Sequence, residues 1–225
     1  MPAPAAPATD IAVVVIGAGG HAAEVCSYVA DLRRESPAIR LLGCVDDRKP
    51  IGRSGPVEII GDFAMFETLV RTEPGLRCIV AVGDNATRKQ LVSRVDALGR
   101  PDLWLTLRHP AALVGQDVTI GPGTCLAPGS IVTTRVRIGA HVIVNVKASV
   151  SHDAVVGDYV NLNPGAAAAG NTRLGEGCYI GAGATVIDKV SVGDWTIVGA
   201  GAAVVRDLPA NVTAVGVPAR VIKQR

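Results

Sequence analysis

His152 and Asp153 are the two neighbouring residues of this chain whose side chains best fit a proton transfer. The chain has four histidines. A neutral imidazole can accept a proton near pH 7, because its unperturbed pKa is about 6.5. A carboxylate beside it can bond the other ring nitrogen and fix the tautomer. The pair therefore predicts a general base, His152, oriented by Asp153, and the competing interpretation is an exposed surface histidine.

Neither the other histidines nor the cysteines indicate a metal site. His141 has no polar neighbours, and no second or third ligand has suitable spacing. The five cysteines are scattered without a Cys-x-x-Cys pair, which is typical of reduced thiols in a cytosol. Cys178 falls on an inward position of the repeat described below, so we expect it in the core. We predict no metal and a cytoplasmic location.

A glycine-rich segment near the N-terminus, Gly17–His21, could bind phosphate. It follows an apolar run over 11–16 and precedes a segment with helical spacing over 21–34. Such a turn exposes backbone N–H groups at the positive end of a helix. Asp46 and Asp47 end a second strand, at the sheet edge where ligands bind in open α/β folds. The alternatives are a structural turn, a solvated aspartate pair and an NAD site. Asp46 argues against NAD, because it lies further along the chain than the acidic residue of a dinucleotide site.

A six-residue repeat runs from Val114 to Pro209. Every sixth residue from Val114 to Val204 is apolar, and a small or apolar residue follows four positions later. This period does not fit a helix, but it fits a short strand plus a turn. Three steps close one coil of a triangular prism, so residues that are three steps apart stack. Stacked coils bury an apolar column that one coil could not bury alone.

The middle coils replace small turn residues by polar ones. Asn145 and Asn163 occupy a position that is often glycine and lie three steps of the repeat apart, so we expect them to stack. Asn161 closes the step before Asn163. Gly170 follows His152 by the same three steps and is expected at the same corner, one coil along. A local departure from a repeat is where function is expected.

The chain before the repeat alternates strands and helices, which predicts a parallel sheet. We expect strands over 11–16, 39–45, 57–60, 78–82 and 103–107, and helices over 21–34, 63–71 and 86–98. The chain then divides into a disordered tail (1–10), a Rossmann-like α/β domain (11–108), an all-β parallel β-helix (109–213) and a C-terminal extension (214–225).

Composition excludes several other classes of protein. The net charge is only +2 and the sequence has no basic stripe, which argues against nucleic acid as a partner. No stretch reaches the roughly 18 apolar residues that span a bilayer. The Ala/Pro-rich start lacks the basic region and the apolar run of a signal peptide. We therefore expect neither a nucleic-acid partner nor a membrane.

The chain over about residues 11–222 resembles one family, on the motifs Val14–His21, Gly43–Asp47, Val82–Asn85, His109–Pro110, Ser151–Asp153 and Gly216–Ala219. These are similar to motifs of the PglD-like and perosamine N-acetyltransferases, which modify nucleotide sugars in bacterial glycan synthesis and are related to sialic acid O-acetyltransferases. The resemblance implies a left-handed β-helix, a homotrimer with active sites between prisms, and acetyl-CoA as cosubstrate.

The resemblance also assigns residues to roles. It makes His152 the base and Asp153 its orienter. It implies that the nucleotide sugar is bound by Gly19, Gly20, His21, Asp46, Asp47, Asn85, Asn145 and Asn161. It implies that acetyl-CoA lies along Gly170, Gly181, Gly199, Val217, Pro218 and Arg220. Some relatives carry a second histidine where this chain has Asn161, so a scheme with two histidines is in doubt here.

The expected reaction is acetylation of the amine of a UDP- or GDP-linked sugar, for which the resemblance suggests a 4-amino-4,6-dideoxy sugar. Two alternatives stay open. One is O-acetylation of sialic acid or a similar hydroxyl, and the other is a non-catalytic trimeric scaffold.

Overall fold

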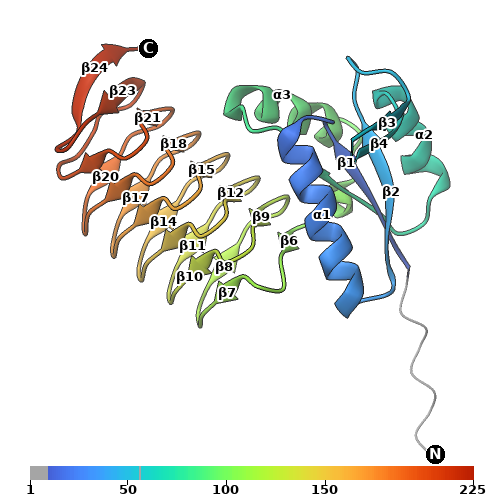
Figure 1. The fold of residues 1–225 in the computed structure, drawn as a ribbon, viewed down its shortest axis with the longest axis horizontal. Coiled ribbons are helices and arrows are strands. Elements are labelled where there is room, and N and C mark those ends of the chain that lie inside the picture. Colours follow the sequence, from blue (N-terminus) through green and yellow to red (C-terminus); the bar gives the residue numbers. More distant parts are fainter. Residues whose placement is uncertain (1–9, 56) are drawn as a thin grey trace, which may run out of the picture.

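The computed structural model describes residues 10–55 and 57–225, so the expected tail over 1–10 lies almost wholly outside the described residues. An α/β domain comes first, and a prism of stacked coils extends from it to the C-terminus (Figure 1). The sequence predicted both architectures.

The N-terminal sheet has five strands in the order β3-β4-β2-β1-β5. Its parallel strands are β1 (Ile11–Ile16), β2 (Ile39–Val45), β4 (Val57–Gly61) and β5 (Leu76–Val80), and β3 (Gly52–Ser54) is antiparallel to β4. The continuous apolar run of β1 is buried on both faces, as expected for the central strand of a covered parallel sheet. The short edge strand β3 was not predicted.

Three helices cover the two faces of this sheet. Helix α1 (Gly20–Glu35) packs on one face, whereas α2 (Phe63–Thr72) and α3 (Asn85–Asp96) pack on the other. Aspartate caps begin α2 and α3: Asp62 accepts a hydrogen bond from Met65 N at 3.1 Å, and Asp84 accepts one from Thr87 N at 2.8 Å. Helix α1 has Gly19 at its N-cap position and no side-chain cap.

The strand expected over 103–107 does not form. Residues Pro101–Leu103 are a 3₁₀ turn, and only Trp104 bridges to the sheet, at Cys78. The next strand, β6 (Leu107–Arg108), pairs with β9 of the prism, and Leu107 N donates to Thr124 O at 2.8 Å. The backbone at this point bonds to the first coil, so the apolar pattern belongs to the prism rather than to the sheet.

The prism has three sheets, and each strand from β6 to β19 pairs in parallel with the equivalent strand of the next coil, three steps of the repeat further on. The first sheet contains β7 (Leu113–Val114), β10 (Ile131–Val132), β13 (Ser149–Val150), β16 (Ala167–Ala168), β19 (Thr185–Val186) and β22 (Ala203–Val204). The second contains β8 (Thr119–Ile120), β11 (Arg137–Ile138), β14 (Val155–Val156), β17 (Arg173–Leu174) and β20 (Ser191–Val192). The third contains β6, β9 (Cys125–Leu126), β12 (Ile143–Val144), β15 (Asn161–Leu162), β18 (Tyr179–Ile180), β21 (Ile197–Val198), β23 (Val212–Val215) and β24 (Arg220–Gln224).

The corners of the prism share one backbone feature. Every sixth residue from Asp117 to Gly201 has a positive φ, close to 60°, which is the left-handed region. Glycine fills some of these positions, but other residues occupy Asp117, Arg135, His141, Lys147, Asp153, Tyr159, Asn171, Lys189 and Trp195. The apolar lead residues point inward and form one continuous core, as the period predicted.

The C-terminal segment closes the last coil. Strand β23 continues the third sheet, and β24 folds back on it in an antiparallel hairpin. None of the helices in the described part of the chain is long and apolar enough to cross a membrane.

Candidate functional site

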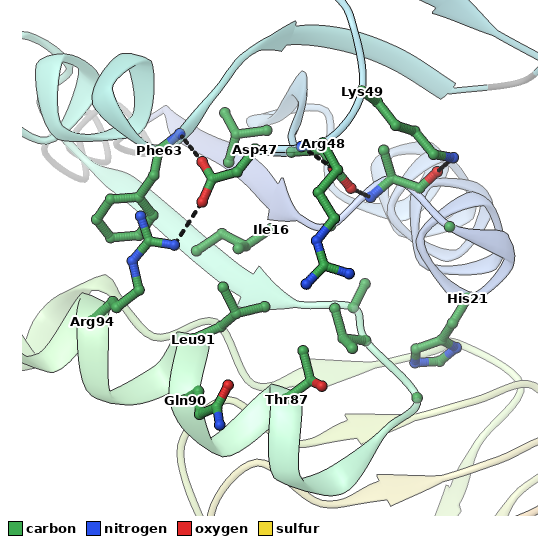
Figure 2. Close-up of a pocket in the computed structure, with 18 of the residues that line it drawn as sticks. Ile16, His21, Asp47, Arg48, Lys49, Phe63, Thr87, Gln90, Leu91 and Arg94 are labelled. Atoms are coloured by element: carbon green, nitrogen blue, oxygen red, sulfur yellow. Dashed lines mark hydrogen bonds and ion pairs between the residues drawn. The ribbon is translucent and has the colours of Figure 1, made fainter.

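The first cavity lies at the carboxyl ends of the parallel strands and has a volume of about 460 Å³. It is lined by the glycine loop, by the segment after β2 and by one side of α3 (Figure 2). Gly19 and Gly20 open onto free space, since a Cβ on either would meet nothing within 4 Å. With no acidic residue in the first turn of α1, this helix start is suited to an anion such as a phosphate.

Asp46 and Asp47 follow β2 and line this cavity, but their carboxylates already accept hydrogen bonds from protein groups. Asp46 accepts from Ala18 N and from Arg48 N, each at 2.9 Å, and so ties the glycine loop to the strand beside it. Asp47 accepts from Phe63 N at 3.0 Å and from Arg94 Nη1 at 2.6 Å. The Arg94 bond lowers the pKa of Asp47 below its usual value.

The cationic side chains of this cavity were not predicted from the sequence. Arg48, Lys49 and Arg94 all line it, and Figure 2 shows the guanidinium of Arg48 pointing into the cavity towards α3. The α3 wall adds Thr87 and Gln90 as polar side chains. Cations beside a free helix start are the surroundings that a diphosphate requires. The run Arg48-Lys49 directly after Asp46-Asp47 was the available signal.

A second cavity, of about 370 Å³, lies between the two domains. The prism contributes Ile143, Asn145, Asn161, Asn163 and Tyr179, and the N-terminal domain contributes His21, Glu24, Gly83 and Asp84. Glu24 and Asp84 carry negative charge beside neutral amides, so this cavity suits a polar group that donates hydrogen bonds, such as a hydroxyl or an amine.

His21 and Gly83 line both cavities. The Nδ1 atom of His21 lies 3.0 Å from a carboxylate oxygen of Glu24, while Nε2 is buried and without a partner among the described residues. Burial lowers the pKa of His21, and the bond to Glu24 opposes that shift in part. A neutral His21 with Nδ1 protonated leaves Nε2 as an acceptor at the junction of the cavities.

Two predicted substrate ligands have their amides engaged between the domains. Asn85 lines neither cavity, and its Nδ2 donates to the carbonyls of Gly177 and Cys178 at 3.0 and 3.1 Å. Asn161 lines the second cavity, but its Oδ1 accepts from Arg88 Nη2 at 2.7 Å and its Nδ2 donates to Gly83 O at 2.6 Å. In the structure both side chains join the domains.

His152 and Asp153 stand together on a corner of the prism. His152 Nδ1 lies 2.8 Å from Asp153 Oδ2, which leaves Nε2 available as a proton acceptor. Gly170 lies beneath the ring, because a Cβ there would come within 2.6 Å of His152 Cε1 and 2.7 Å of Nε2. The stacking expected from the period of the repeat therefore places Gly170 against the imidazole.

The structure does not bring His152 to either cavity within one chain. The N-terminal domain lies against the third sheet, through contacts such as Arg88 with Tyr159 and Asn85 with Gly177. His152 lies in the turn from β13 to β14, which is the edge between the first and second sheets. In a triangular prism that edge is opposite the third sheet, so the pair and the cavities face different sides.

The other predicted acetyl-CoA residues lie along a different edge and at the C-terminal end. Gly181 and Gly199 are covered by the next coil, because a Cβ would come within 2.5 Å of Ala200 N and 2.7 Å of Val215 Cγ1, respectively. Val217 is 77% exposed, and Val217, Pro218 and Arg220 lie in the β23–β24 hairpin region. The two glycines therefore have a packing role, whatever they bind.

His141 and the five cysteines are buried, so their side chains are not available for catalysis. The ring of His141 packs against Trp104 and stacks on Tyr159, and burial lowers its pKa to about 4. All five cysteines are free and buried, and burial raises the pKa of Cys178 to about 12. Cys178 is therefore a core residue, as expected. Across the residues described, no three His, Cys, Asp or Glu side chains group as metal ligands.

Comparison with known families places both domains. Residues 12–95 match the family described as PglD N-terminal domain, and residues 171–206 match the bacterial transferase hexapeptide family of six repeats. A curated relative, UDP-N-acetylbacillosamine N-acetyltransferase of Bacillus subtilis, is 39% identical over 114 residues. That match spans 51% of this chain and 50% of the relative's length.

Solved structures match over nearly the full length. A histidine-to-asparagine variant of perosamine N-acetyltransferase from Caulobacter crescentus, in complex with CoA and GDP-perosamine, is 34% identical, covers 95% of this chain and 97% of its own, and gives a TM-score of 0.86. The acetyltransferase domain of PglB from Neisseria gonorrhoeae in complex with acetyl coenzyme A is 33% identical, covers 96% and 100%, and gives 0.86.

Proposed function

Because this chain belongs to the PglD-like family of nucleotide-sugar N-acetyltransferases, we propose that it transfers the acetyl group of acetyl-CoA to the amine of a nucleotide-linked amino-deoxy sugar. A 4-amino-4,6-dideoxy sugar linked to UDP or GDP is the proposed acceptor, within bacterial surface glycan synthesis. The buried, unpaired cysteines fit a cytoplasmic location.

The observation that carries the reaction is the His152–Asp153 pair above Gly170. In the proposed step the substrate amine attacks the thioester carbonyl, and Nε2 of His152 takes the proton that the amine loses. The new C–N bond forms, the C–S bond breaks, and the CoA thiolate takes the proton from His152 and leaves as the thiol. The backbone N–H of Gly170 is the proposed donor to the oxyanion.

The first cavity supports a nucleotide as the handle of the acceptor. The free start of α1 and the cations Arg48 and Lys49 suit the diphosphate. The sugar would then extend past His21 into the second cavity, where Asn145 and Asn163 lie. Free sialic acid has no diphosphate to use this site, which favours the N-acetyltransferase over the O-acetyltransferase alternative.

The separation of His152 from the cavities supports a homotrimer. One chain places the base on the prism edge opposite its own nucleotide-binding domain. A second copy, packed beside the first, would present its His152 to the second cavity of the first chain, into which the sugar extends. Each proposed active site thus combines the acceptor cavity of one chain with the base of its neighbour.

A thiol-release assay with acetyl-CoA tests the proposal. The acceptors are UDP- and GDP-linked 4-amino-4,6-dideoxy sugars and free sialic acid, and His152→Ala is compared with the unchanged protein. We expect turnover on one nucleotide sugar and a loss of about 10²–10⁴-fold in His152→Ala, with the Kd for the nucleotide sugar within about twofold.

The other outcomes separate the alternatives. Turnover on sialic acid alone would establish the O-acetyltransferase. No thiol release together with no binding of acetyl-CoA would support the scaffold. Full activity of His152→Ala would remove His152 as the base while leaving the substrate assignment standing.

A further inference from the structure

Arg135 forms a third member of the His152–Asp153 pair. Its Nε lies 2.7 Å from Asp153 Oδ1 and its Nη2 lies 2.9 Å from Asp153 Oδ2. The same Oδ2 is 2.8 Å from Nδ1 of His152. The guanidinium therefore holds both carboxylate oxygens, one of which it shares with the imidazole.

The register of the prism makes this contact. Arg135 lies one full coil before Asp153, and both occupy the positive-φ position of the same corner, with φ of 53° and 61°. Asp153 N also donates to Thr134 O at 3.1 Å, which fixes the two turns against each other. The spacing that predicted the contact between Gly170 and His152 would have predicted this one on the opposite side.

Other charged groups surround the three residues along this edge. Asp117 lies one coil before Arg135 in the same column and acts on it electrostatically. On the far side of the ring, Asp188 lies close to Gly170 and 3.7 Å from Lys189 Nζ. His152 thus has carboxylates on two sides, and Arg135 is the cation bonded to the nearer one.

Stability does not explain so specific an arrangement. The side chains of Arg135, Asp153 and His152 are 58%, 33% and 52% exposed, and ion pairs in such surroundings contribute little to folding. A bidentate guanidinium does fix the plane of a carboxylate. It also offsets the negative charge that would otherwise favour a protonated, inactive imidazole.

We propose that Arg135 is a positioning residue of the acetyl transfer, which orients Asp153 towards Nδ1 of His152 and keeps His152 in its neutral, proton-accepting form. This inference rests on the proposed function of His152. The pKa of Asp153 is well below its usual value, chiefly through the bond to Arg135 and next through that to His152, so the carboxylate stays ionised wherever the enzyme works.

Three variants test the proposal: Arg135→Gln, Arg135→Lys and, as a matched control, Arg137→Gln. Arg137 is exposed on β11 and takes part in none of the ion pairs found among residues 10–55 and 57–225. In Arg135→Gln we expect kcat at pH 7 to fall about tenfold and the acid limb of its pH profile to move to higher pH. KM for the nucleotide sugar and Tm should stay unchanged, and Arg135→Lys should recover part of the loss.

NMR titration of the histidine imidazoles gives a readout that does not need turnover. The His152 signal is assigned by its absence in His152→Ala. We expect the midpoint of its protonation to move to higher pH in Arg135→Gln but not in Arg137→Gln. An unmoved midpoint and an unchanged kcat would overturn the role of Arg135, and so would a loss shared equally by the control. A moved midpoint in a protein without acetyl transfer would instead overturn the proposed function alone.

Discussion

Gly170 leaves room for the imidazole ring of His152 because it has no side chain. A Cβ at this position would overlap the His152 imidazole at 2.6–2.7 Å and would reach 2.8 Å from Asp188 Oδ1. The backbone itself would accept alanine, because Gly170 does not have a positive φ. The restriction to glycine therefore comes from the space that His152 occupies.

We predict that Gly170→Ala displaces the imidazole and lowers kcat by about ten- to a hundredfold, since a misplacement of about 1 Å is enough for such a loss. Thiol-release kinetics measure the effect, with Tm as the check on folding. The control is the double variant with His152→Ala. If Gly170 acts through His152, the double variant should be no slower than His152→Ala alone, and a further loss would show a separate role, such as binding the thioester.

His141 gives the chain a dependence of stability on pH. Its pKa is lowered to about 4 by burial between Trp104 and Tyr159, whereas an unfolded histidine titrates near about 6.5. Between these values the unfolded state binds more protons, so stability is fully present above about pH 6.5 and falls as the pH drops towards 4. His21, also lowered by burial, acts in the same direction.

We expect the free energy of unfolding to fall by up to about 3 kcal/mol from His141 alone between pH 7 and pH 4. Urea unfolding at several pH values and one fixed protein concentration measures this. In His141→Phe, which keeps an aromatic ring in the stack, the loss should be smaller by about that amount. An equal loss in both proteins would show that His141 is not the responsible group.

At the scale of elements, the buried Arg88 is one of the α3 side chains that join the two domains. Arg88 is 1% exposed and donates to the carbonyls of His141, Val82 and Tyr159 at 3.0, 2.8 and 2.7 Å. Burial lowers its pKa to about 10, which still leaves it charged at pH 7. Other residues of α3 line the first cavity, namely Thr87, Gln90, Leu91 and Arg94. Arg88 therefore fixes that wall against the prism.

Arg88→Met should destabilise the protein by about 3 kcal/mol, because it leaves buried carbonyls without a donor. It should also raise KM for the nucleotide sugar more than KM for acetyl-CoA. The next residue supplies the control: Lys89 forms an exposed ion pair with Glu176, and Lys89→Met should cost less than about 1 kcal/mol. Equal effects of the two variants would contradict a special role for Arg88.

The sequence predicted elements better than the contacts between them. Strands β1 and β2 begin and end where their apolar runs do, and every prism strand from β6 to β22 follows the six-residue period. The strand expected over 103–107 does not form, because an apolar run does not show which domain its backbone will hydrogen-bond to. Leu107 pairs with a strand of the prism and not with the N-terminal sheet.

The same distinction applies to the candidate site: contacts within the repeat were predictable, and contacts between the domains were not. Gly170 beneath His152 was predictable, because stacking between equivalent positions of successive coils is a property of the repeat. The amides of Asn85 and Asn161 were not, since their partners lie across the domain boundary, where no period relates the two segments. A polar residue that departs from a repeat can serve a docking surface as well as a substrate.

At the scale of the whole molecule, the proposed active site needs two chains, which mixing can test. One parent is His152→Ala. The other is Gly19→Asp, which places a carboxylate where the cavity should bind phosphate, while aspartate remains a favourable residue at the start of a helix. Gly19 has an extended backbone and free space for the side chain, so the variant should fold.

Each parent alone should be inactive. After dissociation and reassembly at equal amounts, a cyclic trimer with shared sites should regain about a quarter of the normal activity, because some interfaces combine an intact cavity with an intact base. The same parents mixed without dissociation are the control. No recovery in trimers shown to contain both chains would place the whole site within a single chain.

The three-step coil also limits how this chain can change in length. An insertion of three complete six-residue steps adds one coil and returns every later residue to its own edge, about 4.8 Å further along the axis. An insertion of one or two steps would instead move His152 or any later residue to another face. Variation in length among descendants of this chain should therefore occur in whole coils, preferably beyond the coils that contact α3, while single-residue gaps should be confined to the N-terminal domain and the C-terminal hairpin.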